Sequence, residues 1–157
     1  MFFDTHTHLG SKQFDGDLAA VLERARSAGV TRMVAPATDL ENARKLLAIA
    51  ENEPDVRVAV GVHPCDADSV EGLSWIDELR ELAKHPKVCA IGEIGLDYFH
   101  APPEGFALAD WKAHQAKVLN AQLELAADLK LNVILHNRES WDDLTALVLP
   151  FSDKLRG

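Results

Sequence analysis

The residues with the clearest chemistry are His6 and His8, which follow a short apolar stretch that begins at Phe2. In an extended strand the side chains of residues i and i+2 point to the same side, so both imidazoles would face one way. Such a pair can chelate a divalent metal ion. Asp4 has the same parity and could orient one of the imidazoles. A His-x-His pair also occurs in ordinary turns, so the interpretation depends on the rest of the chain.

Three further candidates, His63, Glu93 and His136, come at or just after the ends of later apolar runs. Glu93 lies among glycines, whose backbone permits close approach of another group, and this favours a functional carboxylate. His63 precedes a proline and is equally compatible with packing at a strand end. Arg138 could contact an anionic substrate or pair with Glu139.

Other reactive side chains have simpler interpretations. The two cysteines, Cys65 and Cys89, lack Cys-x-x-Cys spacing and are expected to be reduced thiols rather than a disulfide. His85, His100 and His114 fall on predicted helix surfaces or loops, and we interpret them as surface residues.

The candidate residues must be positioned by a chain in which helices and strands alternate. Capping residues and chain breakers predict one helix between Asp17 and Gly29 and another between Asp39 and Pro54. Apolar periodicity predicts the remaining elements: strands at 31–36, 56–62, 88–91 and 132–135 after the opening run, and helices at 75–84, 108–129 and 141–149. The regular alternation indicates about five parallel βα units.

Two α/β architectures fit this order: an open doubly wound sheet, or part of a (β/α)8 TIM barrel. No Gly-x-Gly-x-x-Gly or Gly-Lys-Ser/Thr motif follows the first strand, so the nucleotide-binding form of the open sheet has no support. The candidates at positions 6, 8, 63, 93 and 136 would each follow the carboxyl end of a strand. A barrel gathers these ends on one rim, where its enzymes place their chemistry. We therefore predict a TIM-barrel-type fold with about the first five βα units.

Composition limits the class of protein. The chain has 157 residues, of which 47% are hydrophobic and 26% charged, as expected for one soluble globular domain. There is no apolar run long enough to span a membrane and no signal segment, which favours a cytoplasmic location. The formal net charge of −9 argues against broad electrostatic binding to a nucleic-acid backbone, although bound metal ions would reverse the sign locally.

Four motifs together resemble one family. They are Phe-Asp-Thr-His-Thr-His-Leu at 3–9, Gly-Val-His-Pro at 61–64, Gly-Glu-Ile-Gly-Leu-Asp-Tyr at 92–98, and the block from Gln122 to Arg138. In this order they resemble the TatD-like metal-dependent deoxyribonucleases, a branch of the amidohydrolase-type barrel hydrolases. The resemblance covers essentially the whole chain. It implies hydrolysis of DNA phosphodiester bonds by a two-metal-activated water, often as a 3′ exonuclease acting on single-stranded ends.

The resemblance also implies a metal site. His6 and His8 would bind one divalent ion, Glu93 would bridge two, and His136 would bind the second. Mg²⁺ is the expected ion, and histidine ligands also allow Mn²⁺ or Zn²⁺.

The implied substrate contacts come from three residues. His63 matches an active-site position near the substrate, and together with Glu93 it is a predicted catalytic residue. His63 and Arg138 could neutralise a phosphate, and Tyr98 could stack on a terminal base.

One departure from the family pattern matters. The family continues with a further histidine and a late aspartate, both at the metal site, whereas this sequence ends at Gly157. A whole barrel needs about 250 residues. We therefore expect residues 1–157 to form a single, incomplete domain whose open edges are covered by a complementary C-terminal segment or a second chain. We also expect this chain alone to have impaired activity.

Two alternatives remain open at this point. The same site could serve a two-metal amidohydrolase or lactonase that acts on a small substrate, which the acidic surface fits slightly better than long DNA. The chain could instead be a non-catalytic, truncated scaffold derived from the same barrel.

Overall fold

A computed structural model describes residues 1–155. These residues form one sheet of five parallel strands in the order β1-β2-β3-β4-β5. The strands are β1 (Phe2–Asp4), β2 (Val30–Pro36), β3 (Val56–Val60), β4 (Val88–Asp97) and β5 (Asn132–Arg138). The α-helices are α1 (Leu18–Ser27), α2 (Leu40–Asn52), α3 (Ser74–Leu82), α4 (Leu108–Leu129) and α5 (Trp141–Val148). Short 3-10 helices are η1 (Lys12–Phe14), η2 (Pro64–Ser69) and η3 (Leu149–Phe151).

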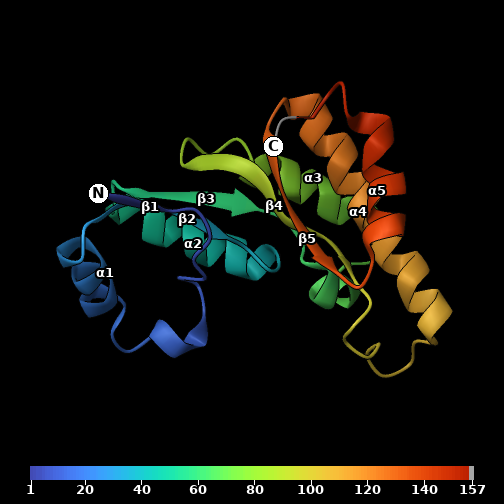
Figure 1. Cartoon of the computed structure of the whole chain (residues 1–157), viewed down its shortest axis with the longest axis horizontal. Helices are drawn as coiled ribbons and strands as arrows, with labels where there is room; N and C mark the ends of the chain where they lie inside the picture. Colours follow the sequence, from blue (N-terminus) through green and yellow to red (C-terminus); the bar gives the residue numbers. More distant parts are fainter. Residues whose placement is uncertain (156–157) are drawn as a thin grey trace.

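Each strand is followed by a helix, so the sheet grows by one strand per βα unit (Figure 1). The main core lies between the sheet and the helices, where Val56, Val58 and Val60 of β3 are completely buried. The opposite face of the sheet carries a smaller apolar cluster around Val34 and Ala59. Both faces are therefore apolar, as in the walls of a parallel barrel. The prediction of five parallel βα units is confirmed.

Two strands are longer than the sequence indicates, and this corrects the placement of two candidate residues. β4 continues to Asp97 and β5 to Arg138, so Glu93 and His136 lie within strands instead of following them. The extension depends on close contact at Gly95, where an added Cβ would collide with the backbone carbonyl of His136. Glycine therefore lets β4 and β5 stay paired up to their ends.

Helix α4 supports the carboxyl ends of two strands through buried amides. Gln122 accepts a hydrogen bond from the Val62 amide at 2.7 Å and donates to its carbonyl at 3.1 Å. Gln115, two turns earlier, bonds both backbone groups of Asp97 at 2.9 and 3.0 Å. Satisfied buried amides of this kind hold the backbone in one position, so α4 fixes the chain on either side of the candidate residues.

The two predicted helix caps differ. Asp39 accepts a hydrogen bond from the Asn42 amide at 2.7 Å and caps α2 as predicted. Asp17 precedes α1 but makes no capping bond with its side chain. Its carboxylate lies 3.6 Å from the guanidinium of Arg24 in the same helix instead.

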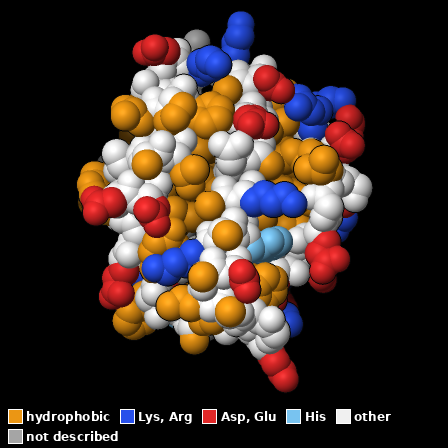
Figure 2. All heavy atoms as spheres, turned by 90° about the vertical axis from the view of Figure 1, so that its right-hand side faces the viewer, with side chains coloured by type: hydrophobic (Ala, Val, Ile, Leu, Met, Phe, Trp, Pro, Cys, Tyr) orange, Lys and Arg blue, Asp and Glu red, His pale blue; other side chains and the backbone are white. Residues whose placement is uncertain are grey.

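The side of the molecule formed by α4 and α5 presents several hydrophobic side chains among acidic and basic ones (Figure 2). Trp141 and Leu149 are each about two-thirds exposed. Among the helices of the described residues, none is both long and apolar enough to cross a membrane.

Candidate metal centre

The first part of the site is formed by His6, His8 and Glu93. The chain leaves β1 after Asp4, and both histidines extend from the following loop toward β4. Their Nε2 atoms lie 3.2 Å apart, and Glu93 Oε2 lies 3.1 Å from His6 and 4.0 Å from His8. Glu93 is buried, whereas the two imidazoles are partly exposed. The three atoms can hold one divalent ion.

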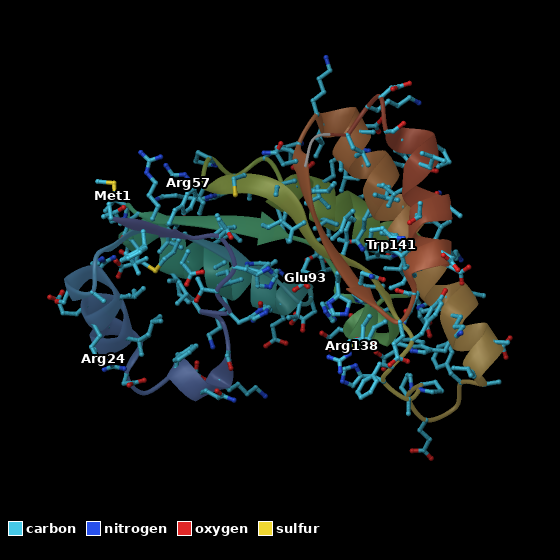
Figure 3. All side chains as sticks on the ribbon, viewed as in Figure 1. Met1, Arg24, Arg57, Glu93, Arg138 and Trp141 are labelled. Atoms are coloured by element: carbon cyan, nitrogen blue, oxygen red, sulfur yellow. The ribbon has the colours of Figure 1, made fainter. Side chains whose placement is uncertain are left out.

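The second part of the site lies on the other side of the same carboxylate. Glu93 Oε1 is 3.0 Å from His136 Nδ1, and His63 Nε2 is 3.1 Å from that nitrogen. The structure therefore brings together the five candidate residues of the sequence analysis, which lie on four different strands or on the loops that follow them. Glu93 lies among them in the middle of the molecule (Figure 3). Its two oxygens face different sets of imidazoles.

The hydrogen-bond partners indicate which ring nitrogens are free to bind a cation. His63 Nδ1 accepts a bond from the Cys65 amide, so in the neutral ring the proton is on Nε2. His136 Nε2 lies 3.0 Å from Asp97 Oδ2 and is placed to donate to it. The lone pair on His136 Nδ1 then accepts from His63 Nε2–H at 3.1 Å, and the same nitrogen lies 3.0 Å from Glu93 Oε1. In the neutral ring the lone pairs of His136 Nδ1 and Glu93 Oε1 repel each other. Either a proton on Nδ1, which turns the contact into a hydrogen bond, or a divalent cation would remove this conflict.

The pKa values reflect the same crowding. Burial lowers the pKa of His63 to about 4, with His136 adding to the effect. The hydrogen bond with Glu93 raises the pKa of His136, against the effect of burial. Burial alone would raise the pKa of Glu93, but His136 and the other imidazoles outweigh it and lower that pKa. Ionisable groups in close contact whose pKa values are shifted are typical of functional sites.

The other two predicted substrate contacts, Arg138 and Tyr98, lie in different places. Arg138, the last residue of β5, has its guanidinium 4.1 Å from the centre of the Phe99 ring and remains exposed at the rim. Tyr98 is not brought to the imidazoles. Its hydroxyl donates to Asp143 of α5 at 2.8 Å, and Lys112 of α4 lies over its ring, on the helix side of the sheet.

A neighbouring group contains residues that the sequence interpretation did not assign to the site. Cys65, Asp97 and His100 also place potential ligand atoms close together. Asp97 was visible in the Gly-Leu-Asp-Tyr motif, but the sequence alone gave it no role. Burial alone would raise the pKa of Asp97. Hydrogen bonds from the His100 amide, the His100 ring and His136 outweigh this effect and lower the pKa below its ordinary value. Burial and the Asp97 carboxylate raise the pKa of Cys65 to about 12.

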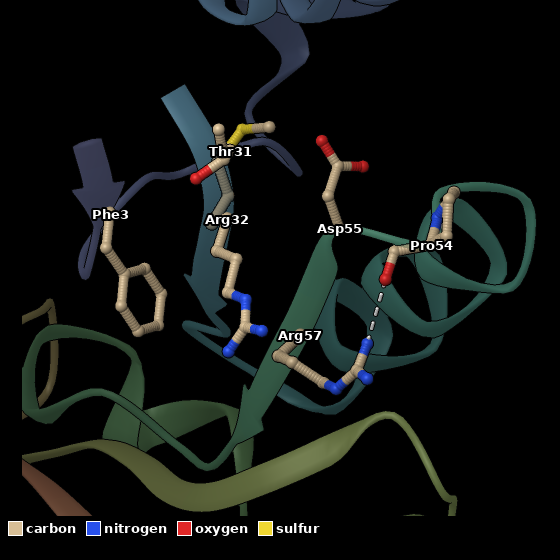
Figure 4. Close-up of a pocket in the computed structure, with 7 residues that line it drawn as sticks. Phe3, Thr31, Arg32, Pro54, Asp55 and Arg57 are labelled. Atoms are coloured by element: carbon tan, nitrogen blue, oxygen red, sulfur yellow. Dashed lines mark hydrogen bonds between the residues drawn. The ribbon is translucent and has the colours of Figure 1, made fainter. Parts of the chain in front are cut away.

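The imidazoles open onto a cavity of about 750 Å³, lined by His6, His8, His63 and Cys65 together with residues of η1 and α2. A second cavity, of about 420 Å³, lies at the amino ends of β2 and β3 (Figure 4). Its lining includes Arg32 and Arg57, and it contains no imidazole. Parallel barrels place chemistry at the carboxyl ends of their strands, so the larger cavity is the candidate substrate site.

Comparison with known proteins relates this geometry to a family. Residues 3–155 match the family described as TatD related DNase. The chain is 38% identical over 161 residues to the 3'-5' ssDNA/RNA exonuclease TatD of Musicola paradisiaca, which covers 98% of this chain and 55% of that protein. It is 36% identical over 151 residues to YabD of Bacillus subtilis, an uncharacterized metal-dependent hydrolase, with 94% and 55% covered.

The crystal structure of YjjV, a TatD homologue from Escherichia coli, aligns with a TM-score of 0.82 and 36% identity. The alignment covers 95% of this chain and 55% of that one. This agreement confirms the prediction of a TIM-barrel-type fold with its first five βα units. The chain thus spans about half the length of the relatives it matches. The resemblance in the four motifs is also confirmed: the chain belongs to the TatD-related DNase family.

Proposed function

We propose that the protein containing this chain is a metal-dependent hydrolase that cleaves phosphodiester bonds at the 3′ ends of single-stranded DNA. The observation that carries the proposal is the position of Glu93. One of its oxygens faces His6 and His8, and the other faces His136. A carboxylate in this position is suited to bridge two cations. The names of the matched relatives support a nucleic-acid substrate.

The residues present fit a pair of divalent ions. His6, His8 and Glu93 would hold one ion, and Glu93 with His136 would hold the other. Bound there, the ions would lower the pKa of a water molecule and stabilise negative charge on the phosphoryl oxygens. Asp97 would orient His136 by accepting a hydrogen bond from its Nε2–H. Mg²⁺ is the proposed ion, with Mn²⁺ or Zn²⁺ as alternatives.

His63 has a different role in this proposal. Since its Nδ1 already accepts from the Cys65 amide, its Nε2–H is a donor and not a metal ligand. That N–H lies 3.1 Å from His136 Nδ1. With a cation on His136 Nδ1, it would donate instead to a phosphate oxygen of the substrate. Arg138, exposed at the rim, would add a second positive group for the phosphate backbone. Stacking of Tyr98 on a terminal base stays a prediction, as do the cytoplasmic location and a partner segment over the open sheet edges.

The test uses an intact polypeptide of the relatives' length that contains this sequence. With Mg²⁺ it should shorten a 5′-labelled single-stranded oligonucleotide from its 3′ end, and EDTA should stop the reaction. Glu93→Gln should reduce the rate by at least about 100-fold because it removes the bridging charge. Glu71→Gln, on the exposed surface, is the matched control and should keep full activity.

A hydrolase for small substrates is the second candidate. The observation that favours it is the net charge of −9, which disfavours long polyanions. A panel of lactones, assayed with and without EDTA, separates the two functions. If the protein hydrolysed a lactone in a metal-dependent reaction and did not cleave the oligonucleotide, the small-substrate function would replace the nuclease proposal. Full activity of Glu93→Gln on the oligonucleotide would refute the bridging role.

A further inference from the structure

Beside the imidazole cluster lies a set of three side chains with mixed chemistry: Cys65 from η2, Asp97 at the end of β4, and His100 from the loop after β4. Cys65 Sγ is 3.5 Å from Asp97 Oδ2 and 3.6 Å from His100 Nδ1. His100 Nδ1 is 2.9 Å from Asp97 Oδ2. All three ligand atoms therefore surround one small space.

These separations match the edges of a tetrahedral zinc site. With Zn–S near 2.3 Å and Zn–N and Zn–O near 2.0–2.1 Å, tetrahedral geometry puts the sulfur about 3.5–3.6 Å from the nitrogen and from the oxygen. Both observed sulfur distances lie in this range. The nitrogen–oxygen edge would be about 3.3 Å, so His100 must move by only a few tenths of an ångström. Its side chain is 58% exposed and has room to do so.

The carboxylate in this set is held in place before any cation binds. Asp97 has a completely buried side chain, and its Oδ1 accepts the backbone amides of Phe99 and His100 at 3.0 and 2.9 Å. Its Oδ2 is left facing Cys65, His100 and His136. Pre-positioned ligands reduce the cost of ordering a metal site.

The ligand type separates this set from the neighbouring centre. The two groups around Glu93 contain only imidazole and carboxylate, whereas this set adds a thiol. Thiolate is a soft ligand that favours Zn²⁺ and is poorly suited to Mg²⁺. We propose that Cys65, Asp97 and His100 form a third cation site, which takes Zn²⁺ and leaves its fourth position open.

The open position has a defined use. Cys65 lines the same cavity as His6, His8 and His63, so an oxygen of a substrate phosphate or a water molecule can complete the tetrahedron. Asp97 Oδ2 also lies 3.0 Å from His136 Nε2. A cation held by Asp97 would therefore link the third site to the orientation of His136.

Cobalt spectroscopy tests the proposal directly, because a thiolate bound to Co²⁺ gives a near-ultraviolet charge-transfer band that imidazole and carboxylate ligands do not. The metal-free 157-residue chain is titrated with Co²⁺ alone. The wild type should show this band, Cys65→Ser should lose it, and Cys89→Ser should keep it. Cys89 is the matched control because its thiol faces the Val58 carbonyl and belongs to none of the ligand groups in residues 1–155.

Three further measurements keep the test informative if one variant fails to fold. His100→Ala changes an exposed loop residue, and the Co²⁺ concentration at half-maximal band intensity should rise at least about tenfold. Native mass spectrometry with Zn²⁺ should find one ion fewer on Cys65→Ser than on Cys89→Ser. His6→Ala/His8→Ala should keep the sulfur band, which separates this site from the centre at Glu93.

Three outcomes would overturn the third site. The first is a wild type that binds Co²⁺, as seen from absorption bands in the visible range, but shows no near-ultraviolet sulfur band. The second is a sulfur band that survives in Cys65→Ser, and the third is an equal zinc count in Cys65→Ser and Cys89→Ser.

Discussion

The charged groups at the two ends of the sheet differ in how they are paired. At the amino end, Arg26 donates to both oxygens of Asp55 at 2.9 and 2.6 Å and also pairs with Glu53. At the carboxyl end, Glu93 and the imidazoles crowd together without a lysine or arginine partner among the groups that contact them in the described residues. The amino end is a closed ion-pair network. The carboxyl end is an array of ligands arranged for a cation.

The contrast shows how residues for function and residues for stability can be separated in a parallel α/β fold. Satisfied ion pairs hold elements together and need nothing further. Converging acceptors are costly unless something positive binds to them. Substitutions at the two ends should therefore affect different measurements.

The largest effect is expected for metal binding. His6→Ala/His8→Ala should weaken Mn²⁺ binding by at least about 100-fold, or roughly 2.7 kcal/mol, because two ligand nitrogens are lost. Titration calorimetry on the 157-residue chain measures this. Arg26→Ala should leave the affinity within about twofold, since it acts at the other end. Equal Mn²⁺ affinities in wild type and the double variant would remove the two histidines from the site.

The second effect concerns stability at the amino end. Arg26→Ala should lower the free energy of unfolding by about 2 kcal/mol, because two carboxylates lose charged hydrogen bonds that solvent replaces only in part. Urea denaturation in the presence of EDTA measures the change. The His6/His8 double variant should be less affected in this assay, since its side chains are partly exposed. A larger loss in the double variant would contradict the division between the two ends.

The third effect is the pH dependence of that ion-pair network. The hydrogen bond from Arg26 is the main cause that lowers the pKa of Asp55. A lowered carboxyl pKa gives stability that is present above its ordinary value of about 3.9 and is lost as the pH falls through the folded value. The stability difference between wild type and Arg26→Ala should therefore shrink below about pH 4. A difference that stays constant down to the acid transition would show that Asp55 is not the linked group.

The smallest effect is expected at Tyr98. Tyr98→Phe removes the hydroxyl that donates to Asp143, and solvent can partly replace this bond, so stability should fall by about 0.5 kcal/mol. The Mn²⁺ affinity should not change, because the ring faces α4 and α5. A tenfold loss of Mn²⁺ affinity would show that Tyr98 reaches the ligand array.

The order of elements was predictable from the sequence because it follows local patterns. Alternating apolar runs and helical periodicity gave the five βα units, and the expected helix at 108–129 matches α4. The candidates came together because parallel strands bring their carboxyl ends to the same rim. The family resemblance named His6, His8, Glu93 and His136 as candidate ligands without any distance between them, and their role in metal binding stays a proposal.

The rest could not be predicted because it depends on contacts between distant segments. The lengths of β4 and β5 follow from their mutual pairing, which the apolar runs alone do not reveal. His100 looked like a loop residue, and only the end of β4 places it beside Asp97 and Cys65. Tyr98 follows a strand-end motif, but alternation along β4 turns its ring to the helix side, opposite to Asp97.

The paired amides of α4 have a consequence for how the rim can move. Gln115 and Gln122 lie on one continuous helix. Their side chains are hydrogen-bonded to the main chain at Asp97 and at the residue before His63. Any tilt of that helix must carry both strand ends along together. We therefore expect the distance between those two segments to change little during thermal motion, because both are hydrogen-bonded to the same helix.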